Sequence, residues 1–391
     1  MEKVLFISHN AGRSGAPLVL LNLLKWLKEN TSLSFEILLR GPGELQAEFA
    51  DLAPTFLFSC QKSSENALSR ICRKIGLSDN LSATHHQNLL NHFRESGIKL
   101  IFSSTFTNGD ILQTLAPLGC RVITHVHELN YWIDLSGTTN IQQVLKHTSR
   151  YIAGSKVVRD NLITARSIPP DNIDLAHEFI PIPDISADPT GIREKFAISE
   201  GSFVVLGSGH ETWRKGKDLF VQLAAQVQKI MPEPLPHFLW VGGFENDEIR
   251  RQIFHDVEKL GLTGRVHFTG AVPGTLNYFA VGDLFAMVSR EDSFPLVCLE
   301  AALLGKPTIC FADVGGMTEF VDDDAGVVVP YLDLEAMAGH IVSLLKNETT
   351  RTRLGNNARE KVLTIYNVAS GSERIAEIIN RELRKNDLLT A

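Results

Sequence analysis

Short apolar segments of strand length alternate with helical segments along almost the whole chain. The first, Val4–Ser8, is a continuous run of the kind that forms a strand buried on both faces of a sheet. A glycine-containing loop, His9–Ala16, and an apolar helix from Pro17 to about Glu29 follow it. Repeated strand–helix units form a parallel sheet with helices on both faces. The sequence therefore predicts an α/β protein.

The alternation continues to the C-terminus. Further strands are expected at Phe35–Leu39, Thr55–Phe58, Lys99–Ser103, Arg121–Val126, Tyr151–Gly154, Phe203–Gly207, His237–Val241, Val266–Phe268, Leu284–Ser289 and Pro307–Phe311. Further helices are expected at Asn66–Ile75, Thr84–Glu95, Gly109–Leu115, Lys156–Ala165, Asp218–Met231, Asp247–Leu260, Phe294–Leu304, Leu334–Lys346, Thr352–Thr364 and Ser370–Arg384. Apolar residues in the last of these form an amphipathic stripe that should pack on a domain surface.

One proline-rich stretch, Phe179–Pro189, interrupts the pattern with three prolines in eleven residues. Because proline blocks regular elements, this stretch is a candidate linker. A chain of 391 residues is also too long for one ordinary core. We therefore expect domains at 1–183 and 190–368, followed by a C-terminal helix at 369–391, for which packing against the first domain is one option.

The composition excludes several classes of protein. A formal charge of −7 argues against a generic nucleic-acid binder, with a local basic patch left open as the alternative. The five cysteines are scattered without a CxxC pair, so neither a zinc site nor a disulfide framework is expected. No window approaches the roughly 20 apolar residues of a membrane span, and the N-terminal apolar run is too short for a signal peptide. The composition favours a cytoplasmic enzyme.

Glu300 is the only charged residue between Phe294 and Gly305. A carboxylate in so apolar a helix costs free energy unless it meets a partner. Asp292 stands eight residues earlier, in the loop that precedes the helix. Ligands of parallel sheets bind at the carboxyl ends of the strands, so both carboxylates are candidates for one binding site.

A second candidate site is the loop Gly207–Lys217, in which Arg214, Lys215 and Lys217 stand at the start of a helix. Cations at this end oppose the helix dipole and become favourable when an anion is bound. The pattern favours a phosphate site, with a solvated basic loop as the alternative. The spacing is not that of a P-loop.

Two glycine loops and two histidines complete the candidates. Gly15 precedes the first helix, where backbone N–H groups could meet a phosphate, although an ordinary strand-to-helix turn explains it equally well. Gly315 and Gly316 would admit a ligand close to the backbone, or form a tight turn. His127 ends a strand, with His125 as the competing choice and a packing role as the alternative for either.

In the order in which they occur, these motifs resemble the retaining glycosyltransferases of family four, the glycosyl transferases group 1. The resemblance covers nearly the whole chain. The matching segments are SGAPLVLLNLL (Ser14–Leu24), HVHEL (His125–Leu129), WRKGKD (Trp213–Asp218), DSFPLVCLE (Asp292–Glu300) and GGMTEFV (Gly315–Val321). The DSFPLVCLE segment is similar to the family's E-x7-E motif, with Asp in the first position.

The resemblance implies the GT-B fold, in which two Rossmann-like βα domains face each other across a cleft. It also implies transfer of a sugar, with retention and without a cofactor or metal, from a nucleoside-diphosphate sugar to a glycan, lipid-linked or other hydroxyl acceptor, in polysaccharide or glycoconjugate biosynthesis. The implied roles are a diphosphate site at Gly15, Arg214 and Lys215; a ribose and sugar site at Glu300, Phe294, Pro295 and Leu296; a donor loop at Gly209, Gly315 and Gly316; and catalytic residues His127 and Asp292.

Gly209-His210 stands where many members of the family carry an Arg after the glycine, which leaves Arg214 to take the phosphate role. A nucleotide-sugar 2-epimerase or phosphorylase, and a non-catalytic nucleotide-sugar-binding subunit, remain the rival classes. The donor nucleotide is UDP or GDP. Leu129–Thr139, with Tyr131 and Trp132, is a candidate rim for the acceptor or else a packing segment. The expected location is the cytoplasm, with peripheral contact at the inner face of the membrane as an option.

Overall fold

A computed structural model describes residues 3–59, 77–184 and 189–390 and divides the chain into two compact units. The first unit comprises Met1–His177 together with Val368–Ala391, and the second comprises Glu178–Asn367. The division falls N-terminal to the domain limits at 183 and 190 expected from the prolines. The C-terminal helix belongs to the first unit.

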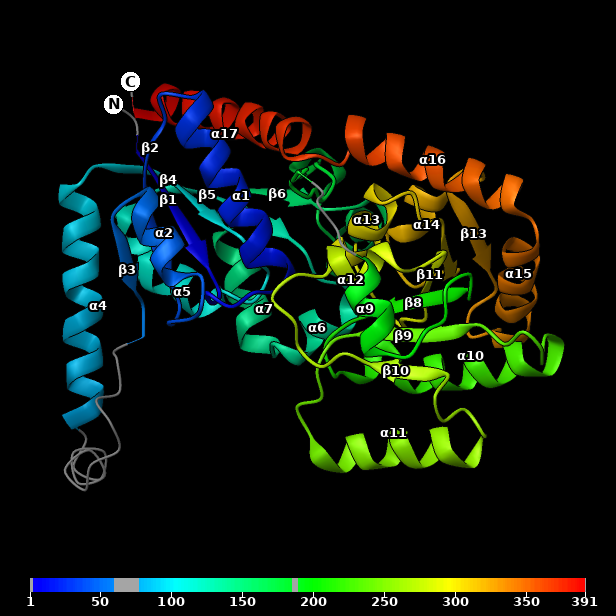
Figure 1. The fold of residues 1–391 in the computed structure, drawn as a ribbon. Coiled ribbons are helices and arrows are strands. Elements are labelled where there is room, and N and C mark those ends of the chain that lie inside the picture. The colour runs from blue at the N-terminus through cyan, green and yellow to red at the C-terminus, as the bar shows by residue number, and fades with distance from the viewer. Residues whose placement is uncertain (1–2, 60–76, 185–188, 391) are drawn as a thin grey trace. The chain divides into compact units, whose positions relative to one another are not determined.

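The described part of the first unit contains a seven-stranded sheet in the order β3-β2-β1-β4-β5-β6-β7, and all neighbouring strands are parallel (Figure 1). Its strands are β1 (Lys3–Ser8), β2 (Ser34–Leu39), β3 (Thr55–Leu57), β4 (Ile98–Ser103), β5 (Arg121–Val126), β6 (Arg150–Ala153) and β7 (Ile173–Leu175). Its helices are α1 (Gly15–Asn30), α2 (Gln46–Leu52), α4 (Leu77–Glu95), α5 (Gly109–Leu115), α6 (Asn130–Leu135), α7 (Thr138–His147), α8 (Lys156–Arg166) and α17 (Val368–Thr390), with 3-10 turns η1 (Ala116–Leu118) and η2 (Pro170–Asn172).

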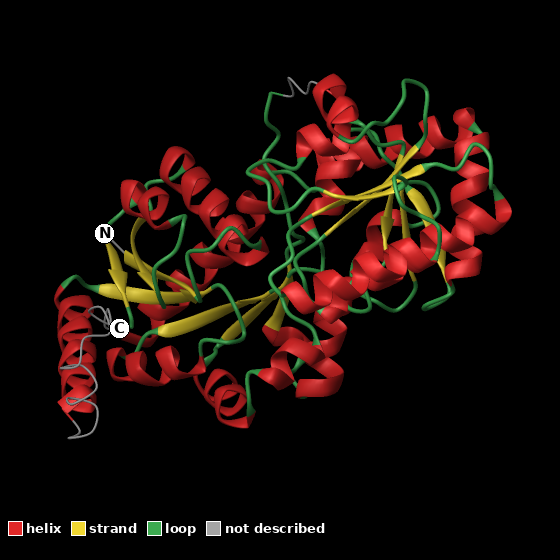
Figure 2. Cartoon of the chain, turned by 60° about the horizontal axis from the view of Figure 1, so that its bottom comes forward, coloured by secondary structure: helices red, strands yellow, loops and turns green. Residues whose placement is uncertain are grey.

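The described part of the second unit contains a six-stranded parallel sheet in the order β10-β9-β8-β11-β12-β13. Its strands are β8 (Val204–Ser208), β9 (His237–Val241), β10 (Val266–Phe268), β11 (Leu284–Met287), β12 (Thr308–Phe311) and β13 (Gly326–Val329). Its helices are α9 (Pro189–Lys195), α10 (Lys217–Ile230), α11 (Asp247–Lys259), α12 (Leu276–Ala280), α13 (Leu296–Leu303), α14 (Met317–Val321), α15 (Leu334–Lys346) and α16 (Glu348–Thr364), with the 3-10 turn η3 (Trp213–Lys215). Figure 2 shows helices on both faces of each sheet, as the strand–helix alternation predicts.

Several element limits differ from the sequence-based expectation. The helix expected at Phe294–Leu304 begins only at Leu296, because Pro295 is its N-cap with an extended backbone. The strand expected to reach Ser289 ends at Met287. The short strands β7 and β13 and the short helices α6, α7 and α12 were not predicted. The helix expected at Asn66–Ile75 lies outside the described residues.

The apolar stripe of α17 packs on the first unit. Ile375, Ile378, Ile379 and Leu383 are at most 2% exposed, and the helix contacts α1, β4 and β5. Burying such a stripe is what keeps an amphipathic helix on a domain surface. The amphipathic pattern is therefore confirmed.

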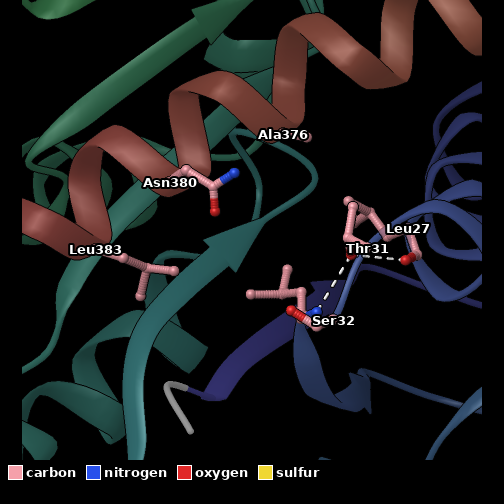
Figure 3. Close-up of a pocket in the computed structure, with 7 residues that line it drawn as sticks. Leu27, Thr31, Ser32, Ala376, Asn380 and Leu383 are labelled. Atoms are coloured by element: carbon pink, nitrogen blue, oxygen red, sulfur yellow. Dashed lines mark hydrogen bonds between the residues drawn. The ribbon is translucent and has the colours of Figure 1, made fainter.

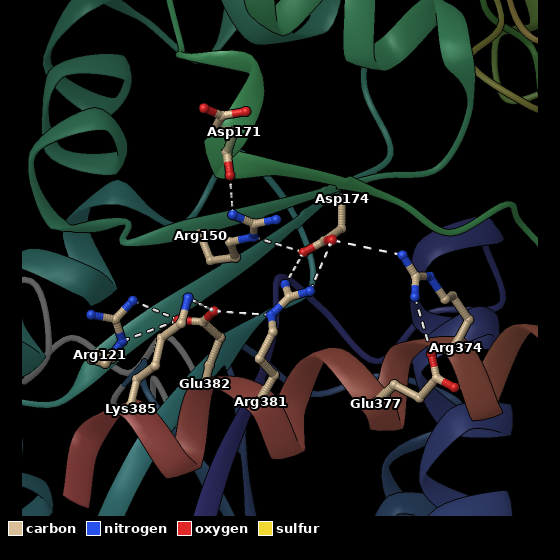
Figure 4. Close-up of polar contacts among 9 residues, drawn as sticks. All are labelled: Arg121, Arg150, Asp171, Asp174, Arg374, Glu377, Arg381, Glu382 and Lys385. Atoms are coloured by element: carbon tan, nitrogen blue, oxygen red, sulfur yellow. Dashed lines mark hydrogen bonds and ion pairs between the residues drawn. The ribbon is translucent and has the colours of Figure 1, made fainter. Parts of the chain in front are cut away.

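Ion pairs fix the polar edge of α17 to the starts of the neighbouring strands (Figure 4). The fully buried carboxylate of Glu382 accepts hydrogen bonds from Arg121 Nη2 at 2.5 Å and from Lys385 Nζ at 2.9 Å. Burial opposes ionisation of Glu382, but these cations hold its pKa below the ordinary value. Asp174 of β7 binds Arg150 Nε at 2.7 Å and also pairs with Arg381 of the helix.

Each sheet has a point at which the strand order reverses, between β1 and β4 in the first unit and between β8 and β11 in the second. The loops that leave neighbouring strands at such a point diverge to opposite faces of the sheet and leave room for a ligand. The two reversal points are therefore the places at which each unit can bind a ligand.

Candidate active site

In the second unit, the loops that follow β8 and β11 meet around the carboxylate of Asp292. Asp292 is 5% exposed. Arg214 Nη1 lies 3.3 Å from Oδ1, and Lys215 Nζ pairs with Oδ2. Burial opposes ionisation of Asp292, but Lys215 and Arg214 hold its pKa below the ordinary value. The sequence analysis assigned Arg214 and Lys215 to the diphosphate and Asp292 to catalysis. In the structure the side chains of all three residues lie in one cluster.

Two cations face one carboxylate in this cluster, so the three groups together retain one positive charge. The side chains of Arg214 and Lys215 are 19% and 11% exposed. Positive charge at this depth attracts an anion more strongly than charge in bulk water, because the surroundings screen it less. The phosphate expected from the sequence at the start of this helix stays a prediction, and within the chain both cations contact Asp292.

Lys217, the third basic residue of the loop, has a different environment. Its Nζ donates to the carbonyl oxygen of Gly243 at 2.5 Å and lies 3.8 Å from the centre of the Phe244 ring. Burial lowers its pKa to about 8. Of the three cations predicted from the loop, Lys217 therefore packs at the β9 side and does not join the Asp292 cluster.

Arg290, which the sequence analysis missed, connects the two loops. Its guanidinium binds both carboxylate oxygens of Asp218, at 2.6 and 3.0 Å, and donates to the carbonyl oxygen of Trp213 at 2.7 Å. Its backbone N–H donates to the carbonyl oxygen of Arg214 at 2.6 Å. The bidentate geometry fixes orientation as well as charge. Arg290 therefore holds the η3 turn, with its two cations, against the loop of Asp292.

Glu300 lies on α13 and has a partner within the chain. The hydroxyl of Thr275 donates to Glu300 Oε2 at 2.5 Å. Burial raises the pKa of Glu300, and the Thr275 hydrogen bond opposes that rise only in part. This answers the expectation that a carboxylate in an apolar helix needs a partner. The carboxylate has four lone-pair positions, so a ligand hydroxyl could still be accepted.

The Gly315-Gly316 loop packs against the backbone of the Asp292 loop. A Cβ on Gly315, whose φ is +148°, would lie 1.6 Å from the carbonyl oxygen of Asp292. Asp292 N–H donates to the Val314 carbonyl oxygen at 2.7 Å, and Gly316 N–H donates to that of Ser293 at 2.8 Å. Close approach within the chain therefore explains the glycine at 315, and the role of this loop toward a donor stays a prediction.

Gly209 follows β8 and lies beside Lys215, whose Cγ would be 3.0 Å from a Cβ at this position. Its carbonyl oxygen accepts a hydrogen bond from Trp240 Nε1 at 3.2 Å. A side chain here would displace the stem of Lys215. Gly209 thus supports the position of a cluster residue.

The segment Phe294–Leu296 leads into α13. Phe294 and Pro295 are buried, and the ring of Phe294 stacks on Tyr366 with a centroid distance of 5.4 Å and an interplanar angle of 21°. Leu296 is partly buried and packs against the same core. The side chain of Phe294 is therefore a core residue, and the segment can serve a ligand through its backbone.

In the first unit, His127 stands directly after β5. Its Nε2 lies 3.3 Å from the hydroxyl of Ser104, which follows the neighbouring strand β4. Glu128 accepts hydrogen bonds from His127 N–H at 3.0 Å, from Phe106 N–H at 3.1 Å and from the Thr105 hydroxyl. Glu128 therefore ties the two strand ends together beneath His127.

The structure separates the two histidine candidates. The rings of His125 and His127 are 4.0 Å apart, but His125 is only 1% exposed whereas His127 is partly exposed. Burial lowers the pKa of His125 well below the ordinary value, with His127 adding to the shift. His125 is therefore a neutral core residue, and His127 is the one that a ligand can reach.

The N-terminus of α1 lies at the same edge of this sheet, after β1. Gly15 is its first residue, and a Cβ there would meet no described atom within 4 Å. His9, in the same loop, is kept neutral because burial, His127 and Arg40 lower its pKa to about 4. The open space in front of Gly15 is compatible with a ligand at the helix end.

The hollow shown in Figure 3 lies away from these residues. It measures about 240 Å³ and is lined by Leu27, Thr31, Ser32, Leu33, Ala376, Asn380 and Leu383, from the end of α1 and from α17. It contains none of the predicted site residues.

Among the described helices, none combines the length and the apolar character that crossing a membrane requires.

Comparisons with known proteins agree with this architecture. Residues 189–361 match the family model described as Glycosyl transferases group 1. The crystal structure of the Anabaena protein HepE in complex with UDP superposes with a TM-score of 0.79 at 19% identity, covering 97% of this chain and 100% of that chain. At this identity the likeness concerns the fold, and it confirms two Rossmann-like units of the GT-B type.

Curated relatives match part of the chain. D-inositol 3-phosphate glycosyltransferase of Corynebacterium kroppenstedtii is 24% identical over 62% of this chain and 56% of its own length. N-acetyl-alpha-D-glucosaminyl L-malate synthase of Bacillus anthracis is 32% identical over 45% of this chain and 44% of its own length. The chain spans about half the length of the curated relatives it matches. Over residues 189–361 the chain is therefore similar to the glycosyl transferases group 1 family, and the likeness to the GT-B fold extends over both units.

Proposed function

We propose that the protein is a glycosyltransferase that moves a sugar from a nucleoside-diphosphate sugar to a hydroxyl acceptor. The observation that carries this proposal is the convergence of Arg214 and Lys215 on the buried Asp292, at the point where the strand order of the second sheet reverses. A net positive cluster there suits the diphosphate of a donor. The family match and the relative named D-inositol 3-phosphate glycosyltransferase support the same class of reaction.

The reaction needs stabilisation of the leaving group. The acceptor oxygen bonds to the anomeric carbon while the bond from that carbon to the phosphate oxygen breaks, and the nucleoside diphosphate leaves with the electron pair. Arg214 and Lys215 would stabilise this developing charge, since fixed cations in a water-poor site need little reorganisation. In this proposal the two side chains take the role that a divalent metal ion has in other sites. Removal of divalent ions with a chelator should therefore leave the activity unchanged.

Two carboxylates take donor-binding roles in the proposal. Glu300 would accept hydrogen bonds from the ribose hydroxyls with the lone pairs that Thr275 leaves open. Asp292 would exchange part of its contact with Lys215 for the hydroxyls of the donor sugar as the diphosphate arrives. Neither is proposed as the acid or nucleophile of a glycosidase.

In the first unit, the groups proposed to meet a ligand are the His127 side chain and the N–H groups at Gly15, at the carboxyl edge of the sheet. Transfer would proceed with retention, the acceptor proton passing to a leaving phosphate oxygen. This route needs no separate base, which agrees with the involvement of Glu128 in three hydrogen bonds within the chain.

A thermal-shift screen with UDP, GDP and their sugars tests the donor role directly. A nucleotide that binds the folded state at 100 times its Kd should stabilise the fold by about 2.7 kcal/mol. Transfer is then followed by release of the nucleoside diphosphate with a panel of hydroxyl acceptors. NMR of the product gives the anomeric configuration, which the proposal expects to match the donor.

Binding of a nucleotide sugar without transfer to any acceptor would favour the non-catalytic subunit. Conversion of the free nucleotide sugar into its C2 epimer would favour the epimerase class. Failure of every nucleotide to stabilise the protein would reject the proposed function.

A further inference from the structure

The hydroxyl of Thr275 binds Glu300 and does not cap its own helix. Thr275 is the N-cap residue of α12, and its side chain accepts no hydrogen bond from the N–H groups of that helix. Thr, Ser, Asp and Asn are preferred at this position because they accept such bonds, as Asn246 does for α11 and Asp333 for α15. The Thr275 hydroxyl instead donates to Glu300 Oε2 at 2.5 Å. A departure from the local preference is typical of residues that have a function.

Thr275 approaches Glu300 from an element that the core holds in place. Its carbonyl oxygen accepts hydrogen bonds from Tyr278 N–H at 3.0 Å and from Phe279 N–H at 2.9 Å, at the start of α12. Phe279 is completely buried, and its ring lies edge-on to Phe285 of β11 with a centroid distance of 5.6 Å. Helix α12 also contacts α13, which carries Glu300. The backbone of Thr275 is therefore fixed, and its hydroxyl can orient the carboxylate.

The hydrogen bond gives the two oxygens of Glu300 different environments. Oε2 accepts from Thr275, whereas no group in the described part of the chain donates a hydrogen bond to Oε1. Glu300 keeps partial exposure, which a ligand needs to reach the carboxylate. A ribose hydroxyl that donates to Oε1 meets an acceptor whose direction is already set, so less conformational entropy is lost on binding.

The same contact affects the charge of Glu300. Burial raises the pKa of Glu300, and the hydrogen bond from Thr275 lowers it. Helices α12 and α16 and strands β11 and β12 pack against α13. Their titratable groups include Tyr278 of α12 and Cys310 of β12, and burial raises the pKa of Cys310 and of Cys298 on α13 itself, so both thiols are neutral. The partly buried cations of α16 donate to backbone carbonyl oxygens elsewhere, and they are Arg351 and Lys361.

We propose that Thr275 is a positioning residue for the donor: its hydroxyl holds Oε2 of Glu300 so that Oε1 accepts a hydrogen bond from a ribose hydroxyl of the nucleotide. The inference rests on the proposed function and on the ribose role of Glu300 in it. An ionised carboxylate accepts stronger hydrogen bonds than a protonated one, so the ribose contact is lost as the pH falls through the Glu300 pKa. Removing the Thr275 hydroxyl raises that pKa, because a hydrogen bond to the charged form favours ionisation. The loss should then occur at higher pH.

The test uses isothermal titration calorimetry with UDP, GDP and their 2′-deoxy and 3′-deoxy forms between about pH 4 and 8. The readout is the Kd of the deoxynucleotide divided by the Kd of the ribonucleotide, because titration of the phosphates affects both alike and cancels. Thr275→Val removes the hydroxyl at the same shape, Thr275→Ala is a second variant without it, and Thr275→Ser keeps it. Thr349→Val is the control, since Thr349 is an exposed residue of α16. Circular dichroism checks the fold.

For the nucleotide that binds, the wild-type ratio at neutral pH should be about ten, as expected of one hydrogen bond to a charged group. Thr275→Val should lower the ratio to about three and move the midpoint of its acid loss up by about one pH unit. Thr275→Ser and the control should stay within about twofold of wild type.

An unchanged ratio and midpoint in Thr275→Val, or an equal loss in Thr275→Ser, would overturn the inference and leave the proposed function standing. Failure of both Thr275→Val and Thr275→Ala to fold would assign Thr275 to stability and overturn the inference as well. A wild-type ratio near one would reject the ribose role of Glu300 together with the inference, but not the diphosphate site. Absence of binding by every nucleotide would reject the proposed function itself.

Discussion

The substitution Asp292→Asn separates the structural role of the carboxylate from its role toward the donor. Asn keeps the size and one acceptor oxygen but removes the charge, so Arg214 and Lys215 would lose the carboxylate that they share. Their side chains are only 19% and 11% exposed. Breaking a buried ion pair by removing one partner costs about 3–5 kcal/mol. The remaining amide oxygen reduces this cost to an expected ~2–3 kcal/mol.

The assay is thermal unfolding without and with UDP and GDP. For a unit of this size, 1 kcal/mol corresponds to roughly 2–4 °C, so the melting temperature of the nucleotide-free variant should fall by about 4–12 °C. The nucleotide that binds should raise the melting temperature of the variant by more than it raises that of the wild-type protein. The reason is that its phosphates replace the missing carboxylate between the two cations. Transfer should nevertheless fall about 100-fold if Asp292 also holds the donor sugar.

The pH dependence gives an internal check on this reasoning. The folded-state pKa of Asp292 is lowered, so its ionised form stabilises the fold above the ordinary Asp pKa of about 4, and this stabilisation is lost as the pH falls through the folded-state value. The difference in stability between wild type and variant should be constant from about pH 6 to 8 and shrink below about pH 4.

The matched control is Asp247→Asn, because the Asp247 side chain is 83% exposed. It should change the melting temperature by less than about 1 °C, as expected of an exposed ion pair. Two results would refute the idea that the Asp292 carboxylate and the diphosphate bind the same two cations. One is an Asp292→Asn protein as stable as wild type, and the other is a variant that gains less stability from nucleotide than wild type does.

Three further perturbations follow from individual contacts. Glu300→Gln should raise the melting temperature of the nucleotide-free protein near pH 8, because burial raises the pKa of Glu300 and the stabilisation by its protonated form is lost as the pH rises through that value; donor KM should rise about tenfold, and an unchanged KM in steady-state kinetics would contradict the ribose role. Gly315→Ala should cost more than about 3 kcal/mol or prevent folding, since its Cβ would lie 1.6 Å from a backbone oxygen; a denaturation midpoint equal to wild type would contradict this. Glu382→Gln should destabilise the first unit by about 2–4 kcal/mol without changing nucleotide affinity, since it leaves Arg121 and Lys385 without a buried anion. Weaker nucleotide binding by calorimetry would contradict a purely structural role for Glu382.

The fold was largely predictable because its signals are local. Runs such as Val4–Ser8 are apolar throughout, and a strand of a parallel sheet needs little more than that. Short elements were missed where the tertiary context decides the conformation. Helix α6 has only six residues, too few for a helical period, and its position depends on Arg166 from a distant helix.

The sequence indicated a set of candidate site residues but not the contacts among them. The sequence indicated that Arg214, Lys215 and Asp292 serve a ligand, yet it could not show that Lys215 pairs with Asp292 across 77 positions. Arg290 carried no signal as an isolated arginine, because its function depends on Asp218 and on a carbonyl oxygen. The sequence predicted that a ligand approaches the glycines at 315 and 316, and the structure shows that the chain's own backbone lies close to Gly315.

The central claim is that Arg214 and Lys215 bind the diphosphate of the donor. Isothermal titration with UDP and GDP should compare wild type with Arg214→Gln/Lys215→Met/Asp292→Asn, which removes all three charges at similar volume and leaves no unpaired buried ion. The account predicts that Kd for the preferred nucleotide rises at least 100-fold while the circular dichroism spectrum is unchanged. A Kd within threefold of wild type, in a folded variant, would contradict it.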